Sequence, residues 1–275
     1  MSACRLYTYA VIGVLGTAAW STELSAAHAP GMHDGMTHEG MAMPTQAENA
    51  PSAVDERAPF GMPMHDDHAI FHLLLEQLEY RDGQDAGIFH WEGQAWYGND
   101  AHRLWVKSEG EISDNHFEHG RHELLYGRPV TPYFDVLAGL RSDIDDDPAE
   151  TWLALGVQGL APGFFHVSMT AYANADADLA FNGEASFDLL LTQRLILQPK
   201  IEVDLYTGNN QSRGIGSGFS AFEGGLRLRY EIDRKFAPYI GANYERKFGN
   251  TRAYAVADGQ DPENLVLVAG VRTWF

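Results

Sequence analysis

The sequence predicts an all-β protein: an antiparallel transmembrane β-barrel of about twelve strands, preceded by a disordered N-terminal segment. Three observations lead to this fold class. After residue 67, apolar and polar side chains alternate with a period of two, turn signals recur between the alternating stretches, and the chain ends on a strand with a terminal phenylalanine. No apolar run beyond the N-terminal one suggests a helix that crosses a membrane.

The N-terminus carries a predicted export signal. Arg5 precedes an apolar run over residues 10–20, and small residues follow at 25–27, which is the order of charge, apolar core and cleavage site in a secretory signal. A membrane anchor is the alternative, but the run is shorter than the roughly 20 residues that a spanning helix needs. We expect residues 1–27 to be removed. The single cysteine, Cys4, is lost with them, which leaves no thiol for a disulfide or a metal site.

Residues 28–67, hereafter the leader, differ in composition from the rest of the chain. They hold six of the eight methionines, several histidines and frequent prolines, and they show no apolar periodicity. Such a segment cannot bury a core, so we expect it to be disordered without a ligand. Its short repeated units suggest several similar small sites. The candidate ligands, including the histidine directly after the leader, are Met32, His33, Met36, His38, Met41, Met43, Met62, Met64, His65 and His68.

The mixture of thioether and imidazole groups in the leader indicates copper. A thioether is a soft ligand that few biological metals select, whereas imidazole is borderline and also serves zinc and nickel. Methionine favours Cu(I), and histidine or carboxylate favours Cu(II). A zinc or nickel store would use histidine without methionine. The alternative is a flexible spacer of accidental composition, but methionine is uncommon in disordered linkers, so we favour copper binding.

Residues 68–275 form a series of amphipathic strands in this interpretation. In the stretch 195–206, leucine, isoleucine and valine face one side, while glutamine, lysine, glutamate and aspartate face the other. No convincing amphipathic helix of useful length is present in the sequence. The turn signals lie at residues 81–83, 98–100, 142–148, 208–210, 247–250 and 258–262.

Alternation alone fits either a soluble sandwich with a dry interior or an outer-membrane barrel with an apolar exterior. Two features favour the barrel. Apolar residues alternate back from Phe275 through the last strand, 265–275, which resembles the assembly signal of outer-membrane barrels. Aromatic residues also cluster at strand ends, as expected for girdles at membrane interfaces. These aromatic residues are Trp91, Tyr97, Tyr126, Tyr133, Tyr172, Tyr206, Tyr230, Tyr239 and Tyr244.

Several blocks of the strand region resemble the copper resistance protein B family of bacterial outer-membrane proteins. The blocks are Leu78 to Tyr80, Trp91 to Trp96, Arg103 to Glu111, Glu123 to Tyr126 and Ala154 to Pro162. The resemblance covers nearly all of residues 68 to 275. It implies a role in copper tolerance, a location in the outer membrane, a leader in the periplasm and a periplasmic multicopper oxidase as partner. The leader departs from the simple tandem repeats of the family's longest leaders, so the number of copper sites stays open.

The polar strand face supplies a second set of candidate ligands. By alternation, His90 and Glu92 face the lumen, as does His166 on another strand. Each is more often a solvated polar residue than a ligand, but together they suggest a lumenal copper path. The spacing of three in His116, His119 and His122 places successive members on opposite faces of a strand. The acidic residues on the polar face either help copper to move or pair with basic neighbours in a structural network. The acidic residues are Glu92, Glu109, Glu111, Glu202, Asp204 and Glu223, and the basic ones are Lys107, Lys200, Arg227 and Arg229.

The charge balance restricts the possible partners. The chain has 38 acidic and 19 basic side chains, a formal charge of -19, which excludes nucleic acid as a partner. Copper and outer-membrane lipid are the expected partners, and we expect no enzymatic activity. Two alternatives stay open, an enzyme of the lipid A deacylase type that uses His166 with Ser168, and a nonselective porin.

Overall fold

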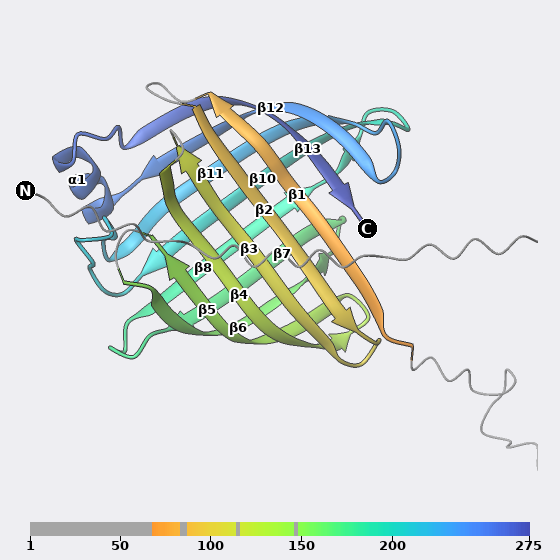
Figure 1. The fold of residues 1–275 in the computed structure, drawn as a ribbon, viewed down its shortest axis with the longest axis horizontal. Coiled ribbons are helices and arrows are strands. Elements are labelled where there is room, and N and C mark those ends of the chain that lie inside the picture. Colours follow the sequence, from red (N-terminus) through yellow and green to blue (C-terminus); the bar gives the residue numbers. More distant parts are fainter. Residues whose placement is uncertain (1–67, 83–86, 114–115, 146–147) are drawn as a thin grey trace, which may run out of the picture. The chain divides into compact units, whose positions relative to one another are not determined.

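The computed structural model describes residues 68–82, 87–113, 116–145 and 148–275 (Figure 1). The predicted signal and the leader, residues 1–67, lie outside the described residues. The strands are β1 (Ile70–Asp82), β2 (Gly87–Gly98), β3 (Arg103–Ser113), β4 (His116–Thr131), β5 (Phe134–Ile144), β6 (Glu150–Ala161), β7 (Phe165–Ala173), β8 (Leu179–Phe187), β9 (Leu189–Leu190), β10 (Leu195–Tyr206), β11 (Gly218–Tyr230), β12 (Phe236–Lys247) and β13 (Glu263–Trp274).

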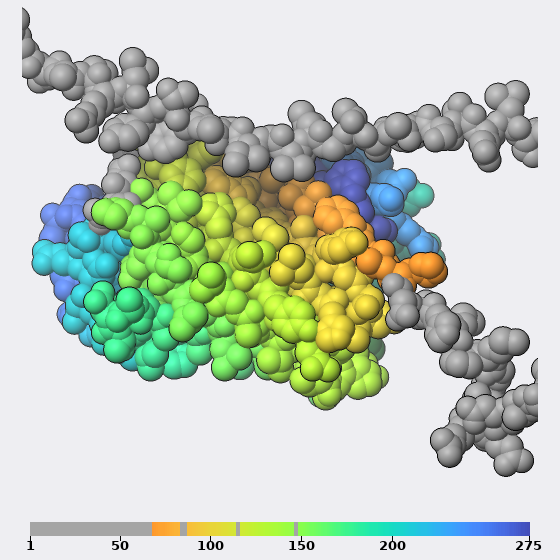
Figure 2. All heavy atoms as spheres, turned by 60° about the horizontal axis from the view of Figure 1, so that its bottom comes forward, coloured from red at the N-terminus to blue at the C-terminus, as the bar shows by residue number. Residues whose placement is uncertain are grey.

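These strands form one closed antiparallel sheet. Apart from β8 and β9, strands that follow one another in sequence pair with one another, and β1 pairs with β13, so the sheet closes on itself. β8 and the two-residue β9 both pair with β10 and are separated only by Asp188. Together they therefore occupy the position of one strand in the barrel wall. Counted in this way, the barrel has twelve strands, which confirms the predicted fold class. On the face drawn in Figure 2, the coloured chain progresses in sequence order from the orange first strand to the green strands.

The barrel wall separates an apolar exterior from a largely polar interior, as the period of two predicts. In β13, Leu265 and Leu267 are 69% and 68% exposed, whereas the valines that alternate with them are buried. Phe275 has the same phase as these leucines and is also exposed. In contrast, charged side chains such as Glu79 and Arg227 are buried inside. This polarity is the inverse of that in a soluble sandwich and fits an outer-membrane location.

The two ends of the barrel differ in their connections. The two longest ones, residues 207–217 and 248–262, lie at the end opposite the C-terminus (Figure 1). We name this end the loop end and the end with the C-terminus the turn end. The chain enters β1 at the turn end (Figure 1).

The connection between β12 and β13 contains a helix that the sequence pattern did not predict. This helix, α1 (Gly249–Ala257), lies at the loop end (Figure 1). Thr251 holds it in place, because its hydroxyl lies 2.7 Å from the Ser220 hydroxyl and accepts a hydrogen bond from the Gly216 N–H at 2.9 Å. The helix therefore depends on tertiary hydrogen bonds rather than on an apolar stripe. In the described part of the chain, no helix is long and apolar enough to cross a membrane.

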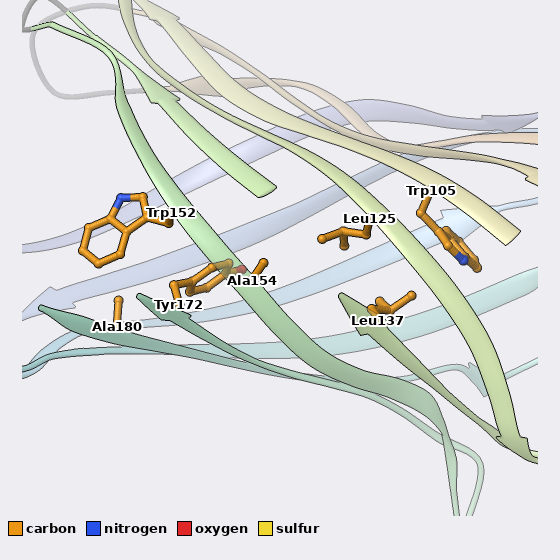
Figure 3. Close-up of a cluster of buried hydrophobic side chains, with 7 residues drawn as sticks. All are labelled: Trp105, Leu125, Leu137, Trp152, Ala154, Tyr172 and Ala180. Carbon is orange, nitrogen blue, oxygen red and sulfur yellow. The ribbon is translucent and has the colours of Figure 1, made fainter. Parts of the chain in front are cut away.

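An apolar cluster lines part of the barrel interior (Figure 3). Its members come from the consecutive strands β3 to β8, and they are Trp105, Leu125, Leu137, Trp152, Ala154, Tyr172 and Ala180. Gly127 leaves room for this cluster, since a Cβ atom there would lie 2.7 Å from Trp105 Nε1 and 2.8 Å from Leu137 Cδ2. Side chains thus fill one side of the lumen, and the polar groups described next occupy the rest.

Candidate functional site in the barrel lumen

A polar cavity of about 620 Å³ lies in the lumen. Pro129, Thr131 and Tyr133, which lie at and beside the connection from β4 to β5, line the cavity at the turn end. Its walls otherwise carry charged and polar side chains, among them His166 and Ser168 on β7. The cavity therefore extends to the turn end of the barrel, where the chain enters β1.

Five carboxylates and two cations form a layer across the lumen. These residues, hereafter the lumenal carboxylate layer, are Glu92, Glu109, Glu184, Glu202 and Asp204 with Lys200 and Arg121. Lys200 Nζ donates to both oxygens of Glu92, at 2.7 and 2.8 Å, and lies 3.5 Å from Glu184. Arg121 lies between 3.6 and 3.8 Å from three further carboxylates. The layer thus contains more carboxyl groups than cationic groups.

A second ionic group lies towards the loop end and is buried more deeply. This buried ion cluster consists of Glu79, Arg81, Glu111, Glu223, Arg227 and Tyr239. Glu79 is 0% exposed and accepts four hydrogen bonds, two from Arg227 at 2.8 and 2.9 Å, one from Arg81 at 2.9 Å and one from Tyr239 at 3.0 Å. Arg81 also donates to Glu111 at 2.9 Å and to Glu223 at 3.3 Å. Because a water-filled pore would leave its lining side chains accessible, we infer from the burial of Glu79, Arg81 and Arg227 that the lumen is closed at this level.

The structure places the predicted lumenal residues in different surroundings. His90 is buried, and its Nδ1 atom lies 3.3 Å from Glu111 Oε1, beside the buried ion cluster. Glu92 belongs to the lumenal carboxylate layer, and His166 lines the cavity. His68 is exposed just before β1, and the leader ligands are outside the described residues. Among the described residues, no group of three or more His, Cys, Asp or Glu side chains is arranged to hold a metal ion.

The histidine group on β4 separates across the barrel wall. His119 pairs with the inward-facing Glu111, whereas His122 pairs with Ser108 on the outer face. Outside, Ser108 accepts a hydrogen bond from Trp91 Nε1 at 3.1 Å and lies 3.1 Å from His122 Nδ1. These two histidines therefore do not converge, as their spacing along a strand predicts.

Sequence reasoning did not identify Glu79 and Arg81 as lumenal residues. The register of β1 shifts between Leu75 and Leu78, because a β-bulge changes which side chains face inward. A continuous period of two cannot be followed through such a bulge. The run of three leucines at residues 73–75 was the available signal, since one face of a regular strand cannot hold three successive apolar residues.

Known proteins identify the family to which this closed barrel belongs. The profile of a family described as "Copper resistance protein B precursor" matches residues 69–275. The chain belongs to the copper resistance protein B family. It is 40% identical to a Copper resistance protein B of Escherichia coli over 225 residues, which cover 80% of this chain and 76% of the relative. It is 37% identical to a Copper resistance protein B homolog of Pseudomonas syringae pv. tomato, with 98% and 96% of the two chains covered.

Two porins are among the solved structures that resemble this member of the copper resistance protein B family. The NanC porin has a TM-score of 0.47 at 12% identity, with 74% of this chain and 99% of the porin covered. The KdgM porin has a TM-score of 0.43 at 11% identity, with 76% and 99% covered. At this level of likeness, nothing follows about the cargo of the barrel.

Proposed function

We propose that this protein acts in copper resistance at the outer membrane, where its leader captures periplasmic copper and its barrel sequesters or exports the metal. The observation that carries the proposal is a barrel of the copper resistance protein B family whose lumen contains an excess of carboxylates. Like charges in a narrow lumen raise the local concentration of cations, and carboxylates bind them without the permanence of a cysteine site.

The leader is the part of this proposal that binds copper most tightly. Its methionines would hold Cu(I), and its histidines would hold Cu(II). Because residue 68 leads directly into β1, which starts at the turn end, the leader is attached where the cavity is located. Cleavage at residue 27 and a leader in the periplasm are parts of the same proposal, as is a periplasmic multicopper oxidase that works with the barrel.

Copper accumulation in cells tests the proposal. Cells that express the full chain, a variant without residues 28–67, or neither are compared for periplasmic and whole-cell copper. A lower whole-cell content with the full chain indicates export, whereas a larger periplasmic pool together with higher copper tolerance indicates sequestration. Copper tolerance and distribution that are the same with and without the leader would refute capture by this segment.

The nonselective porin and the deacylase are the competing functions. The porin requires an open lumen, and the burial of Glu79 and Arg227 argues against one. The deacylase requires His166 to activate Ser168. Both side chains line the cavity inside the barrel, away from lipid, and no hydrogen bond joins them in the described structure. An unchanged lipid A acylation profile in Ser168→Ala cells would exclude the enzyme.

A further inference from the structure

Two cations that line the cavity form no direct hydrogen bond or ion pair with the described side chains. Lys107 on β3 and Arg272 on β13 both face the cavity. The side chain of neither residue forms a hydrogen bond, or an ion pair within 4.0 Å, with another described residue. The Nε atom of Arg272 is also shielded from solvent. Buried guanidinium nitrogens nearly always have a partner, so Arg272 indicates a missing acceptor.

Acidic side chains with unsatisfied oxygen atoms line the same cavity. Glu76 forms no hydrogen bond, and no ion pair within 4.0 Å, in the described part of the chain. Asp188 accepts a hydrogen bond at Oδ2 from Arg229 at 2.8 Å, but its buried Oδ1 atom has no partner. Arg229 itself is 3% exposed and has two unpaired nitrogens, Nε and Nη1. Donors and acceptors without a direct partner are thus present around one cavity.

We propose that this cavity binds a small zwitterion with the chemistry of a free amino acid. Its carboxylate would accept hydrogen bonds from Arg272, supported by the charge of Lys107, and its ammonium group would donate to Glu76 or Asp188. A simple anion would leave Glu76 and Oδ1 of Asp188 without a donor, and a bare cation would leave Arg272 and Lys107 without an acceptor. The cavity volume of about 620 Å³ lies within the range of small-molecule sites. The site needs no copper, so the proposal is independent of the proposed function.

Calorimetric titration of the purified full-length barrel in detergent micelles tests the ligand class. The probes are L-glutamine, its α-amide, which lacks the carboxylate, and N-acetyl-L-glutamine, which lacks the ammonium group. The buffer contains a chelator that removes copper. We expect saturable binding of L-glutamine and affinities at least about ten-fold lower for both analogues, since each loses a charge-assisted contact. Equal binding of the N-acetyl compound, or no saturable binding of any probe, would overturn the proposal.

Substitutions identify the residues that hold the probe. Arg272→Gln and Glu76→Gln should each lower the affinity for L-glutamine about ten-fold or more. Lys235→Gln is the matched control, because Lys235 is a turn-end cation that stacks on Trp274 and does not line the cavity. If Arg272→Gln fails to assemble, Lys107→Gln replaces it with the same expected direction. Unchanged affinity in the assembled Arg272→Gln or Lys107→Gln variant would overturn the assignment.

Discussion

Glu79→Gln should be among the most destabilising conservative substitutions in the barrel. The wild-type carboxylate is 0% exposed and accepts three hydrogen bonds from the guanidinium groups of Arg81 and Arg227 and one from Tyr239. Glutamine keeps the size but removes the charge, and its NH₂ group faces donors instead of accepting from them. Hydrogen bonds to charged groups contribute about 1.5–3 kcal/mol each, and breaking a buried ion pair costs about 3–5 kcal/mol. We expect the free energy of unfolding to fall by about 3–5 kcal/mol.

The assay is reversible urea unfolding of the barrel in lipid vesicles, followed by tryptophan fluorescence. Lys247→Gln is the control, because its ion pair with Glu245 is long, 4.0 Å, and partly exposed, so its loss should change stability by less than about 1 kcal/mol. The double variant Glu79→Met with Arg227→Met should lose less than the sum of its single substitutions, since it leaves fewer unpaired charges. A Glu79→Gln barrel within about 1 kcal/mol of the wild type would refute this account of the buried ion cluster.

Three further outcomes are expected. The mature chain should fractionate with the outer membrane and show heat-modifiable migration on gels, and removal of Phe275 should impair its assembly. A peptide of residues 28–67 should lose most Cu(I) binding when its six methionines are replaced by leucine, whereas Cu(II) binding should persist and weaken as the pH falls through the histidine range. Replacing Glu92 and His90 together by uncharged residues should chiefly lower the unfolding temperature, because Lys200 loses its 2.7 Å partner. Lower copper tolerance at unchanged stability would show instead that the two residues serve a conducting lumen.

The fold could be predicted from the sequence because a barrel wall imposes the same alternation on every strand. The phase of β13 is clear, since each outward leucine is followed by an inward valine up to Val268. β1 could not be resolved in the same way, because its bulge between Leu75 and Leu78 interrupts the pattern. Helix α1 could not be found either, since its position depends on contacts of Thr251 with a distant strand.

The site could be predicted only as a polar face with both signs of charge. The polar face of 195–206 correctly places Lys200 in the lumen, and a paired network was one of the two interpretations of that face. The partner could not be identified, because Lys200 reaches Glu92 over a separation of 108 residues and Arg227 reaches Glu79 over 148. Such contacts depend on barrel closure and strand register, which local periodicity does not encode.

Closure at the level of Glu79 has a consequence for the movement of ions. If an ion is to cross the lumen, the contacts among Glu79, Arg81 and Arg227 must separate, and a cost of about 3–5 kcal/mol makes the open state roughly 10²- to 10⁴-fold less populated than the closed one. The wild-type barrel in a planar lipid bilayer should therefore show rare, brief openings in potassium chloride. Glu79→Gln should raise the open probability, whereas Lys247→Gln, whose ion pair lies outside the cluster, should not. A steadily open wild-type channel would contradict the closed lumen, and an unchanged open probability in Glu79→Gln would show that other contacts keep it shut.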